Sequence, residues 1–295
     1  MRGLFSILTL AALGTLASIG SDAPAAGHAT SAPGTLAIGS NRDGNAELYL
    51  MTESGRILRR LTNNPKFDGG PAWSPDGRRI AFYSQRTPNG DVFVVSVNGS
   101  GLQNLTKNPA HDSLGTWSPD GKWIVFDSNR AGSDDIYVMR ANGSGVRRLT
   151  TDAGSDNQPA WSPDGTTIAF TSDRDGNDEI YVMGLDGSGQ INLSNSPTSE
   201  VGAAWAPNGQ SIAFTSTRKG PEAVYLMDAD GANPRRVTAG VEPTWSSDGK
   251  RIAFTSDLSS HSDIYVVNAG GGGRKKLTRT RFAEFAPAWA PAKRP

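Results

Sequence analysis

The sequence predicts an all-β protein built from six copies of one unit, and two recurring patterns support this. A tryptophan returns at intervals of 44, 44, 44, 40 and 44 residues, at Trp73, Trp117, Trp161, Trp205, Trp245 and Trp289. A β-branched and aromatic run of the type Ile168-Ala169-Phe170 also occurs six times, in step with the tryptophans. Because self-similarity at a period of about 40–45 residues is typical of repeat folds, one unit describes most of the chain.

Each unit contains four short extended segments separated by turns. Pro159 to Trp161 forms the first, and Ser162 to Gly165 is a turn with Pro and Gly at positions that suit their backbone preferences. Residues 167–171 are rich in β-branched and aromatic side chains and form the second, and residues 179–183 form the third. The fourth, residues 147–150 in the neighbouring copy, is short and basic, which suits an outer edge that must not pair with other chains.

Four antiparallel strands in a unit of this length form the blade of a β-propeller. The first copy lacks a tryptophan strand, whereas the last tryptophan strand, Pro287 to Trp289, has no further strands after it. The two ends are therefore complementary parts of one blade. The sequence predicts a six-bladed β-propeller over residues 36–291, closed by pairing of the C-terminal strand with the N-terminal blade at residues 36–62.

The first 29 residues differ in composition from the rest. Arg2 precedes an apolar stretch from Leu4 to Ile19, and the small residues Ala23 to Ala25 resemble a cleavage signal, so residues 1–29 are interpreted as a signal peptide and 30–35 as a linker. Ser, Thr and Gly interrupt the stretch too often for a membrane span of about 20 residues. We therefore expect a periplasmic or secreted protein with no integral membrane span.

Charge and motif content argue against several classes of function. The 29 basic and 29 acidic residues balance, so no bulk charge favours nucleic acid. The chain has no cysteine and three histidines, His28, His111 and His261, and no serine lies in a Gly-x-Ser-x-Gly elbow. No catalytic residue is predicted. His111 and Asp112 could exchange protons, but no nucleophile accompanies them.

One rim of the predicted propeller carries recurring charge. An acidic residue stands five positions before five of the six tryptophans, where each inner strand begins, and Glu242 is the displaced counterpart in the sixth copy, which has Gly240 at this position. With His111 these acids are the candidate binding residues at the channel mouth: Asp68, Asp112, Asp156, Glu200, Glu242 and Glu284. Arginines follow the second strand in five copies, at Arg42, Arg86, Arg130, Arg174 and Arg218, with Leu258 in the sixth.

Two interpretations of this charged rim remain open. The acids and arginines can pair and hold the blades together, since both recur with the period of the fold. Alternatively, the acids bind a divalent cation or a basic partner, and an oxygen-rich site without cysteine would favour Ca²⁺ or Mg²⁺. No resident cofactor is predicted. The repeated tryptophans are expected to pack between blades, whereas Trp123 is out of phase with them and is free to be exposed.

The repeated elements identify a family. Pro159-Ala160-Trp161-Ser162-Pro163-Asp164-Gly165, Ile168-Ala169-Phe170, Glu179-Ile180-Tyr181-Val182-Met183 and Arg148-Leu149-Thr150 are similar to the TolB-type six-bladed propeller, across residues 36–291. TolB is a periplasmic component of the Tol-Pal system, whose propeller binds the peptidoglycan-associated lipoprotein. It carries an α/β domain before the propeller, whereas only the leader and a short linker precede the first blade here.

The resemblance implies a non-catalytic, exported propeller of the bacterial cell envelope that binds a protein or peptide, such as an envelope lipoprotein. Related propellers occur in prolyl-oligopeptidase-like peptidases and in oligogalacturonate lyases. A metal-dependent enzyme that processes carbohydrate or peptide is therefore one alternative function. A propeller that binds a small ligand or a metal is the other.

Overall fold

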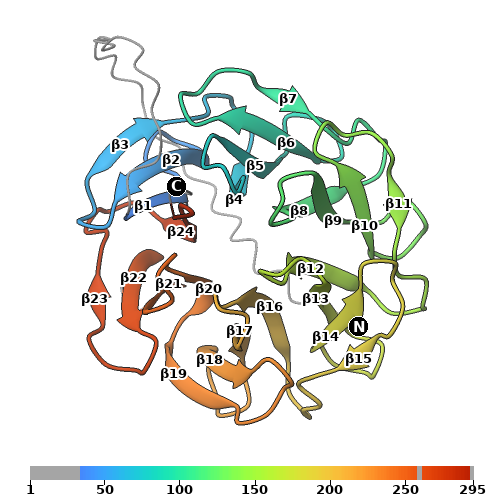
Figure 1. Ribbon diagram of the computed structural model, residues 1–295. Helices are drawn as coiled ribbons and strands as arrows, with labels where there is room; N and C mark the ends of the chain where they lie inside the picture. Colours follow the sequence, from blue (N-terminus) through green and yellow to red (C-terminus); the bar gives the residue numbers. More distant parts are fainter. Residues whose placement is uncertain (1–33, 258–260, 293–295) are drawn as a thin grey trace.

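The computed structural model describes residues 34–257 and 261–292, which form six four-stranded antiparallel sheets arranged in a ring (Figure 1). The predicted leader, residues 1–29, lies outside the described residues, as does most of the predicted linker. Within the described ranges every regular element is a strand. No helix there is long and apolar enough to cross a membrane. The predicted six-bladed all-β propeller is confirmed.

Each blade orders its strands from the centre outward. The inner strands are β4 (Asp68–Trp73), β8 (Asp112–Trp117), β12 (Asp156–Trp161), β16 (Glu200–Trp205), β20 (Val241–Trp245) and β24 (Glu284–Trp289). The second strands are β1 (Thr35–Ser40), β5 (Arg79–Ser84), β9 (Trp123–Ser128), β13 (Thr167–Ser172), β17 (Ser211–Ser216) and β21 (Arg251–Ser256). Inner strands thus end in the repeated tryptophan, and second strands contain the apolar run.

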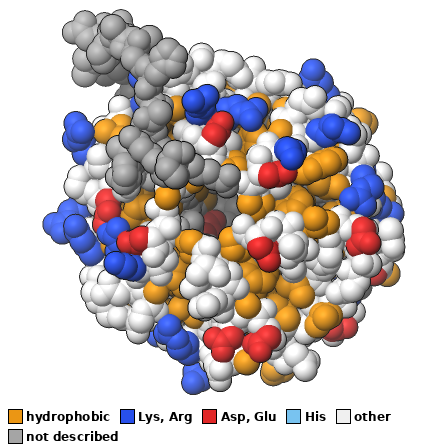
Figure 2. All heavy atoms as spheres, in the orientation of Figure 1, with side chains coloured by type: hydrophobic (Ala, Val, Ile, Leu, Met, Phe, Trp, Pro, Cys, Tyr) orange, Lys and Arg blue, Asp and Glu red, His pale blue; other side chains and the backbone are white. Residues whose placement is uncertain are grey.

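The outer half of each blade is more exposed. The third strands are β2 (Glu47–Thr52), β6 (Asp91–Ser96), β10 (Asp135–Arg140), β14 (Glu179–Gly184), β18 (Ala223–Asp228) and β22 (Asp263–Asn268). The outermost strands are β3 (Ile57–Arg60), β7 (Gln103–Asn104), β11 (Arg147–Arg148), β15 (Ile191–Asn192), β19 (Arg235–Ala239) and β23 (Lys275–Lys276). Most of these last strands are short and basic, as predicted, and Figure 2 shows Lys and Arg side chains at the periphery of the disc.

The Ser-Pro-Asp-Gly turns join inner to second strands at one rim, which we call the turn rim. In the second blade the amide of Gly77 donates to the carbonyl of Ser74 at 2.9 Å, and Gly77 has a φ of 66° that only glycine adopts at little cost. The hydroxyl of Ser74 donates to Asp76 at 2.6 Å. The sequence therefore specifies this turn through its backbone and its side chains together.

The ring closes between the two ends of the described chain. Strand β24 pairs with β1 in the register Leu36↔Trp289 and Ala37↔Ala288, and this sheet has the order β24-β1-β2-β3. The amide of Ala290 donates to the carbonyl of Thr35 at 2.9 Å. The predicted closure, in which the C-terminal strand completes the N-terminal blade, is confirmed.

The hydrophobic core lies between blades. One cluster joins Leu48 and Leu50 of the first blade to Ile80 and Phe82 of the second, and the other clusters repeat this arrangement around the ring. A wholly buried phenylalanine recurs in the second strands, and burial of each contributes about 1.5–3 kcal/mol: Phe82, Phe126, Phe170, Phe214 and Phe254. The repeated tryptophans contact these clusters, as the sequence predicted.

Candidate functional site

The rim opposite the Ser-Pro-Asp-Gly turns carries the predicted ring of charge, and we call it the acid rim. Each of the five acids that begin an inner strand forms an ion pair with an arginine that follows the second strand of the same blade. The distances are 2.8 Å for Arg42–Glu284, 2.6 Å for Arg86–Asp68, 2.8 Å for Arg130–Asp112, 2.9 Å for Arg174–Asp156 and 2.6 Å for Arg218–Glu200. The acid side chains are fully buried, whereas the arginine side chains keep 17–19% exposure.

Hydrogen bonds and aromatic contacts, in addition to the ion pair, position the arginine side chains, as Arg174 illustrates. Arg174 donates from Nε to the hydroxyl of Ser172 at 2.8 Å, and its guanidinium lies over the rings of Phe170 and Tyr181 at 5.5 and 4.6 Å. Such stacking on aromatic rings adds to the ion pair. The guanidinium is therefore fixed in position between a buried acid and two rings.

These contacts confirm that acids and arginines pair around the rim. Each pair lies within one blade, however, so the expectation that the pairs hold neighbouring blades together is wrong. Burial raises the pKa of Asp68 and Asp156, although hydrogen bonds from Ser84 and Ser172 and the adjacent arginines act in the opposite direction. Each of the five acids has a guanidinium as its counter-ion. Direct contact between these acids and a bound partner therefore stays a prediction, and within each pair only the arginine side chain is partly exposed.

The sixth blade departs from this pattern. A Cβ at Gly240 would lie 2.4 Å from the ring of Phe254, so no acid fits there. Glu242 instead lies at a strand irregularity with a φ of 55°, and its Oε2 accepts hydrogen bonds from Thr255 at 2.7 Å and from the amide of Ala286 at 2.9 Å. The side chain is exposed, but the surrounding inner strands desolvate the carboxylate and raise the pKa of Glu242.

Arg274 supplies the missing arginine of the sixth blade. The equivalent position, Leu258, lies outside the described residues. Arg274 precedes the outermost strand β23, and its guanidinium lies 4.4 Å from the ring centre of Tyr265 and 3.2 Å from the hydroxyl of Ser256. It thus makes the serine and aromatic-ring contacts that Arg174 makes in its own blade. The sequence did not reveal that Arg274 takes this place, because Arg274 lies in the loop between the third and fourth strands. The other five arginines follow the second strand.

A row of aromatic rings, which the sequence analysis missed, crosses the acid rim. Phe285 and Phe67 stack at 5.9 Å, Phe67 contacts Tyr83 at 6.0 Å, and Tyr83 contacts His111 at 5.3 Å. We call these four residues the aromatic strip. Phe67, His111 and Phe285 are half-buried, so part of each ring reaches the surface. At the sequence positions equivalent to Phe67 and His111 the other copies have small residues: Ser155, Ser199, Ala239 and Ala283.

Glycine makes room for two of these rings. A Cβ at Gly39 would lie 2.4 Å from Phe285, and a Cβ at Gly69 would lie 2.6 Å from Phe67. Any other residue at either position would displace a ring. Two rings of the strip therefore each depend on a glycine that faces them: Phe285 on Gly39, and Phe67 on Gly69.

His111 also belongs to a second group, which we call the His–Asp–Asp cluster. His111, Asp127 and Asp134 each offer a metal-ligating atom, and these atoms lie within 4.8 Å of one another; within the described ranges this is the one such group of three or more. Burial, followed by the nearby charge of Asp134, raises the pKa of Asp127 well above its ordinary value. Sequence reasoning found His111 but neither aspartate, because neither lies near it in the chain.

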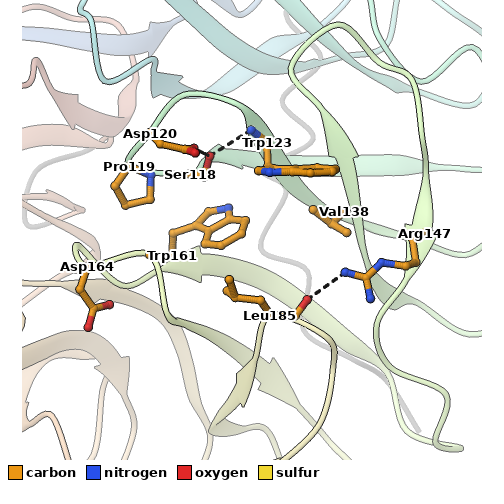
Figure 3. A pocket seen from close by; sticks show the side chains of 10 residues that line it. Ser118, Pro119, Asp120, Trp123, Val138, Arg147, Trp161, Asp164 and Leu185 are labelled. Carbon is orange, nitrogen blue, oxygen red and sulfur yellow. Dashed lines mark hydrogen bonds between the residues drawn. The ribbon is translucent and has the colours of Figure 1, made fainter.

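The turn rim has a groove of about 550 Å³ between the third and fourth blades. Trp123 and Trp161 face into it together with Leu185 and Val138, and Arg147 closes one side by donating to the carbonyl of Leu185 at 3.0 Å (Figure 3). Trp123 is half-buried rather than fully exposed. Figure 2 shows hydrophobic side chains gathered around the central opening on the face in view.

The closed ring and its ion-paired rim define a repeat β-propeller. The chain belongs to the TolB β-propeller family: the family model described as the TolB beta propeller domain matches residues 21–103, 68–158 and 151–291.

Individual relatives agree with this assignment. A TolB homolog from Chlorobium chlorochromatii is 43% identical over 49 residues, which are 17% of this chain and 11% of the relative's length. The crystal structure of TolB from Acinetobacter baumannii has a TM-score of 0.80 at 23% identity, covering 88% of this chain and 67% of that one. A putative TolB from Agrobacterium tumefaciens has a TM-score of 0.71 at 22% identity, covering 87% and 94%. At 22–23% identity, the similarity to these solved structures supports the fold and nothing further.

Proposed function

We propose that this chain is a non-catalytic, exported propeller of the bacterial cell envelope that binds a protein or peptide at the acid rim. The partner class follows from family membership, and an envelope lipoprotein is the partner that the resemblance to TolB implies. We propose a non-catalytic role because the sequence has no nucleophile elbow and no zinc-protease motif.

The observation that carries this proposal is the aromatic strip beside the arginines. Aromatic residues and arginine are enriched at the cores of protein interfaces, where they contribute most of the binding free energy. Phe67 lies directly before Asp68, whose partner Arg86 keeps part of its guanidinium at the surface. The rings also pack against one another and against Gly39 and Gly69, so a partner would order few side chains on binding.

A capture experiment tests the location of the binding surface. Tagged protein would be incubated with envelope extract of the source bacterium, using the parent, a Phe67→Ser Phe285→Ala variant and a Leu185→Ser variant. Serine stands at the position of Phe67 in two other blades, so the fold should tolerate it, and Leu185, 40% exposed, lies on the turn rim. We expect the parent and Leu185→Ser to retain a common protein that the double variant loses. Equal capture by all three would refute the proposed surface.

Export is tested separately. Residues 1–29 would be fused to an alkaline phosphatase without a leader, which becomes active only after export. We expect activity from this fusion, and its loss when Leu8→Arg and Leu10→Arg place charges in the apolar stretch. An inactive parental fusion would contradict periplasmic or secreted localisation.

A further inference from the structure

We propose that His111, Asp127 and Asp134 bind one first-row divalent transition metal ion, such as Zn²⁺ or Mn²⁺, on the acid rim. Their ligand atoms lie within 4.8 Å of one another. Ligand atoms at about 2.0–2.2 Å from a tetrahedral ion lie about 3.3–3.6 Å apart, so the three side chains would turn inward to reach coordination distance. Metal binding at this position does not depend on the protein partner.

The backbone holds the three residues in place. His111 directly precedes β8, Asp127 lies in β9, and Asp134 directly precedes β10, so all three belong to one sheet at one rim. Asn129 fixes His111 from both sides, since its amide donates to the His111 carbonyl at 3.2 Å and its side chain accepts from the His111 amide at 3.0 Å. Tyr83 packs against the imidazole. The site is therefore largely preformed.

Comparison with the other blades indicates that the fold does not require the carboxylate of Asp127. Thr171, Thr215 and Thr255 stand at the equivalent position, and each hydroxyl accepts a hydrogen bond from the next inner strand at 3.1–3.3 Å. Asp127 makes the same kind of contact, accepting from the amide of Gln158 at 3.3 Å. Threonine satisfies the structural role, so the presence of a buried carboxyl group at Asp127 needs another explanation.

The charges around the cluster favour a cation. Asp127 is only 4% exposed, and the Oδ1 atom of Asp134 is buried with no hydrogen-bond partner in the described part of the chain. The ion pairs found there include neither aspartate. Two neighbouring carboxylates in low dielectric are costly unless one of them is protonated or a positive charge lies between them. A divalent ion would supply that charge and satisfy the unpaired oxygen.

The donor set selects the kind of metal. One imidazole nitrogen and two carboxylate oxygens suit Zn²⁺ or Mn²⁺, whereas Ca²⁺ and Mg²⁺ prefer oxygen ligands alone. The five ion-paired acids of the rim differ in having guanidinium counter-ions. Three protein ligands also leave coordination positions open, as in sites that hold water or an external ligand.

Calorimetric titration of the metal-stripped full-length protein with Zn²⁺ and with Mn²⁺ tests this site, together with thermal melts. We expect one ion per chain, and a rise in Tm of about 5–10 °C at a free metal concentration 100 times Kd. The variants Asp127→Thr and His111→Ser copy residues of other blades and should keep the parent's metal-free Tm, while weakening binding at least about tenfold.

Asp178→Ala is the matched control. Asp178 occupies the position of Asp134 in the next blade and accepts from the hydroxyl of Ser199 at 2.7 Å, but in that blade Ser155 stands at the position of His111. Its removal should leave the metal affinity unchanged. The proposal is overturned if neither ion binds the parent, or if Asp127→Thr and His111→Ser bind as tightly as Asp178→Ala does.

Discussion

Arg174 Nη2 lies 2.9 Å from Oδ1 of Asp156, a wholly buried carboxylate at the start of an inner strand. This relationship recurs in five blades and links the strand nearest the channel to the loop between the second and third strands. Because Asp156 is buried, breaking this ion pair should lower the free energy of unfolding more than breaking an exposed ion pair would.

Arg174→Ala should lower the free energy of unfolding by about 3 kcal/mol, since it leaves a buried carboxylate without its counter-ion. The loss should shrink as the pH falls, because burial raises the pKa of Asp156 and the protonated acid needs no counter-ion. Urea unfolding at several pH values measures this. Lys122→Ala removes a solvent-exposed ion pair and should cost under about 1 kcal/mol. Similar losses for the two variants would contradict the structural role of the rim pairs.

Deletion of residues 285–295 should destabilise the whole propeller rather than loosen one end. It removes the pairing of Leu36 with Trp289 and the acceptor of the Trp73 indole, which donates to the carbonyl of Ala288 at 3.0 Å. It also leaves the first blade without an inner strand. A thermal melt should show a large fall in Tm or loss of the cooperative transition, and a truncated protein that melts like the parent would be incompatible with closure by β24.

Asp164→Ala should reduce stability at neutral pH but not at strongly acidic pH. Hydrogen bonds from the Ser162 hydroxyl and the Thr166 amide lower the pKa of Asp164. A lowered carboxyl pKa contributes stability that is present above the unfolded value of about 3.9 and is lost as the pH falls through the folded value. The difference in Tm between parent and variant should therefore vanish toward pH 2. A difference that persists there would show that another contact is responsible.

Trp123→Arg should keep the Tm close to that of the parent. Arg79 and Arg251 stand at the equivalent position of their blades, and their guanidinium groups lie over Trp117 and Trp289 at 4.6 and 5.4 Å. An arginine at position 123 can cover Trp161 in the same way. The variant also carries Arg140→Ser, which copies Ser96 opposite Arg79, because Arg140 lies over the Trp123 ring at 5.4 Å and would otherwise face a second cation. Differential scanning calorimetry measures the change, with Trp123→Gly as the control that leaves Trp161 uncovered. A variant Trp123→Arg as unstable as Trp123→Gly would refute this equivalence.

Residues that recur with the period of the fold were predictable from the sequence. The spacing from Trp73 to Trp289 specified the number of blades, and the unpaired strand at Trp289 specified the closure. The acids and arginines were expected on one rim because both recur at fixed offsets that antiparallel blades bring together. Their pairing was one of two interpretations that the sequence left open.

Features that break the period were not predictable in this way. To predict the aromatic strip, one must know that the rings of Phe285, Phe67 and Tyr83 lie on one surface, although Phe285 is far from the other two in sequence. Asp127 differs from its repeat equivalents, whereas Asp134 matches Asp178, and only the folded sheet places both aspartates beside His111. Arg274 reaches its blade from an unexpected loop. A residue that differs from its equivalents in the other copies is the sequence signal for such a feature, because the fold alone does not explain that residue.

The most direct test of protein binding at the acid rim is photo-crosslinking in living cells of the source bacterium. A photoreactive amino acid at position 67 would report on the aromatic strip, and one at position 185 on the turn rim, which serves as the control. We predict a discrete crosslinked adduct with an envelope protein from position 67 and none from position 185. Adducts from position 185 alone, or from neither position, would contradict binding at the acid rim.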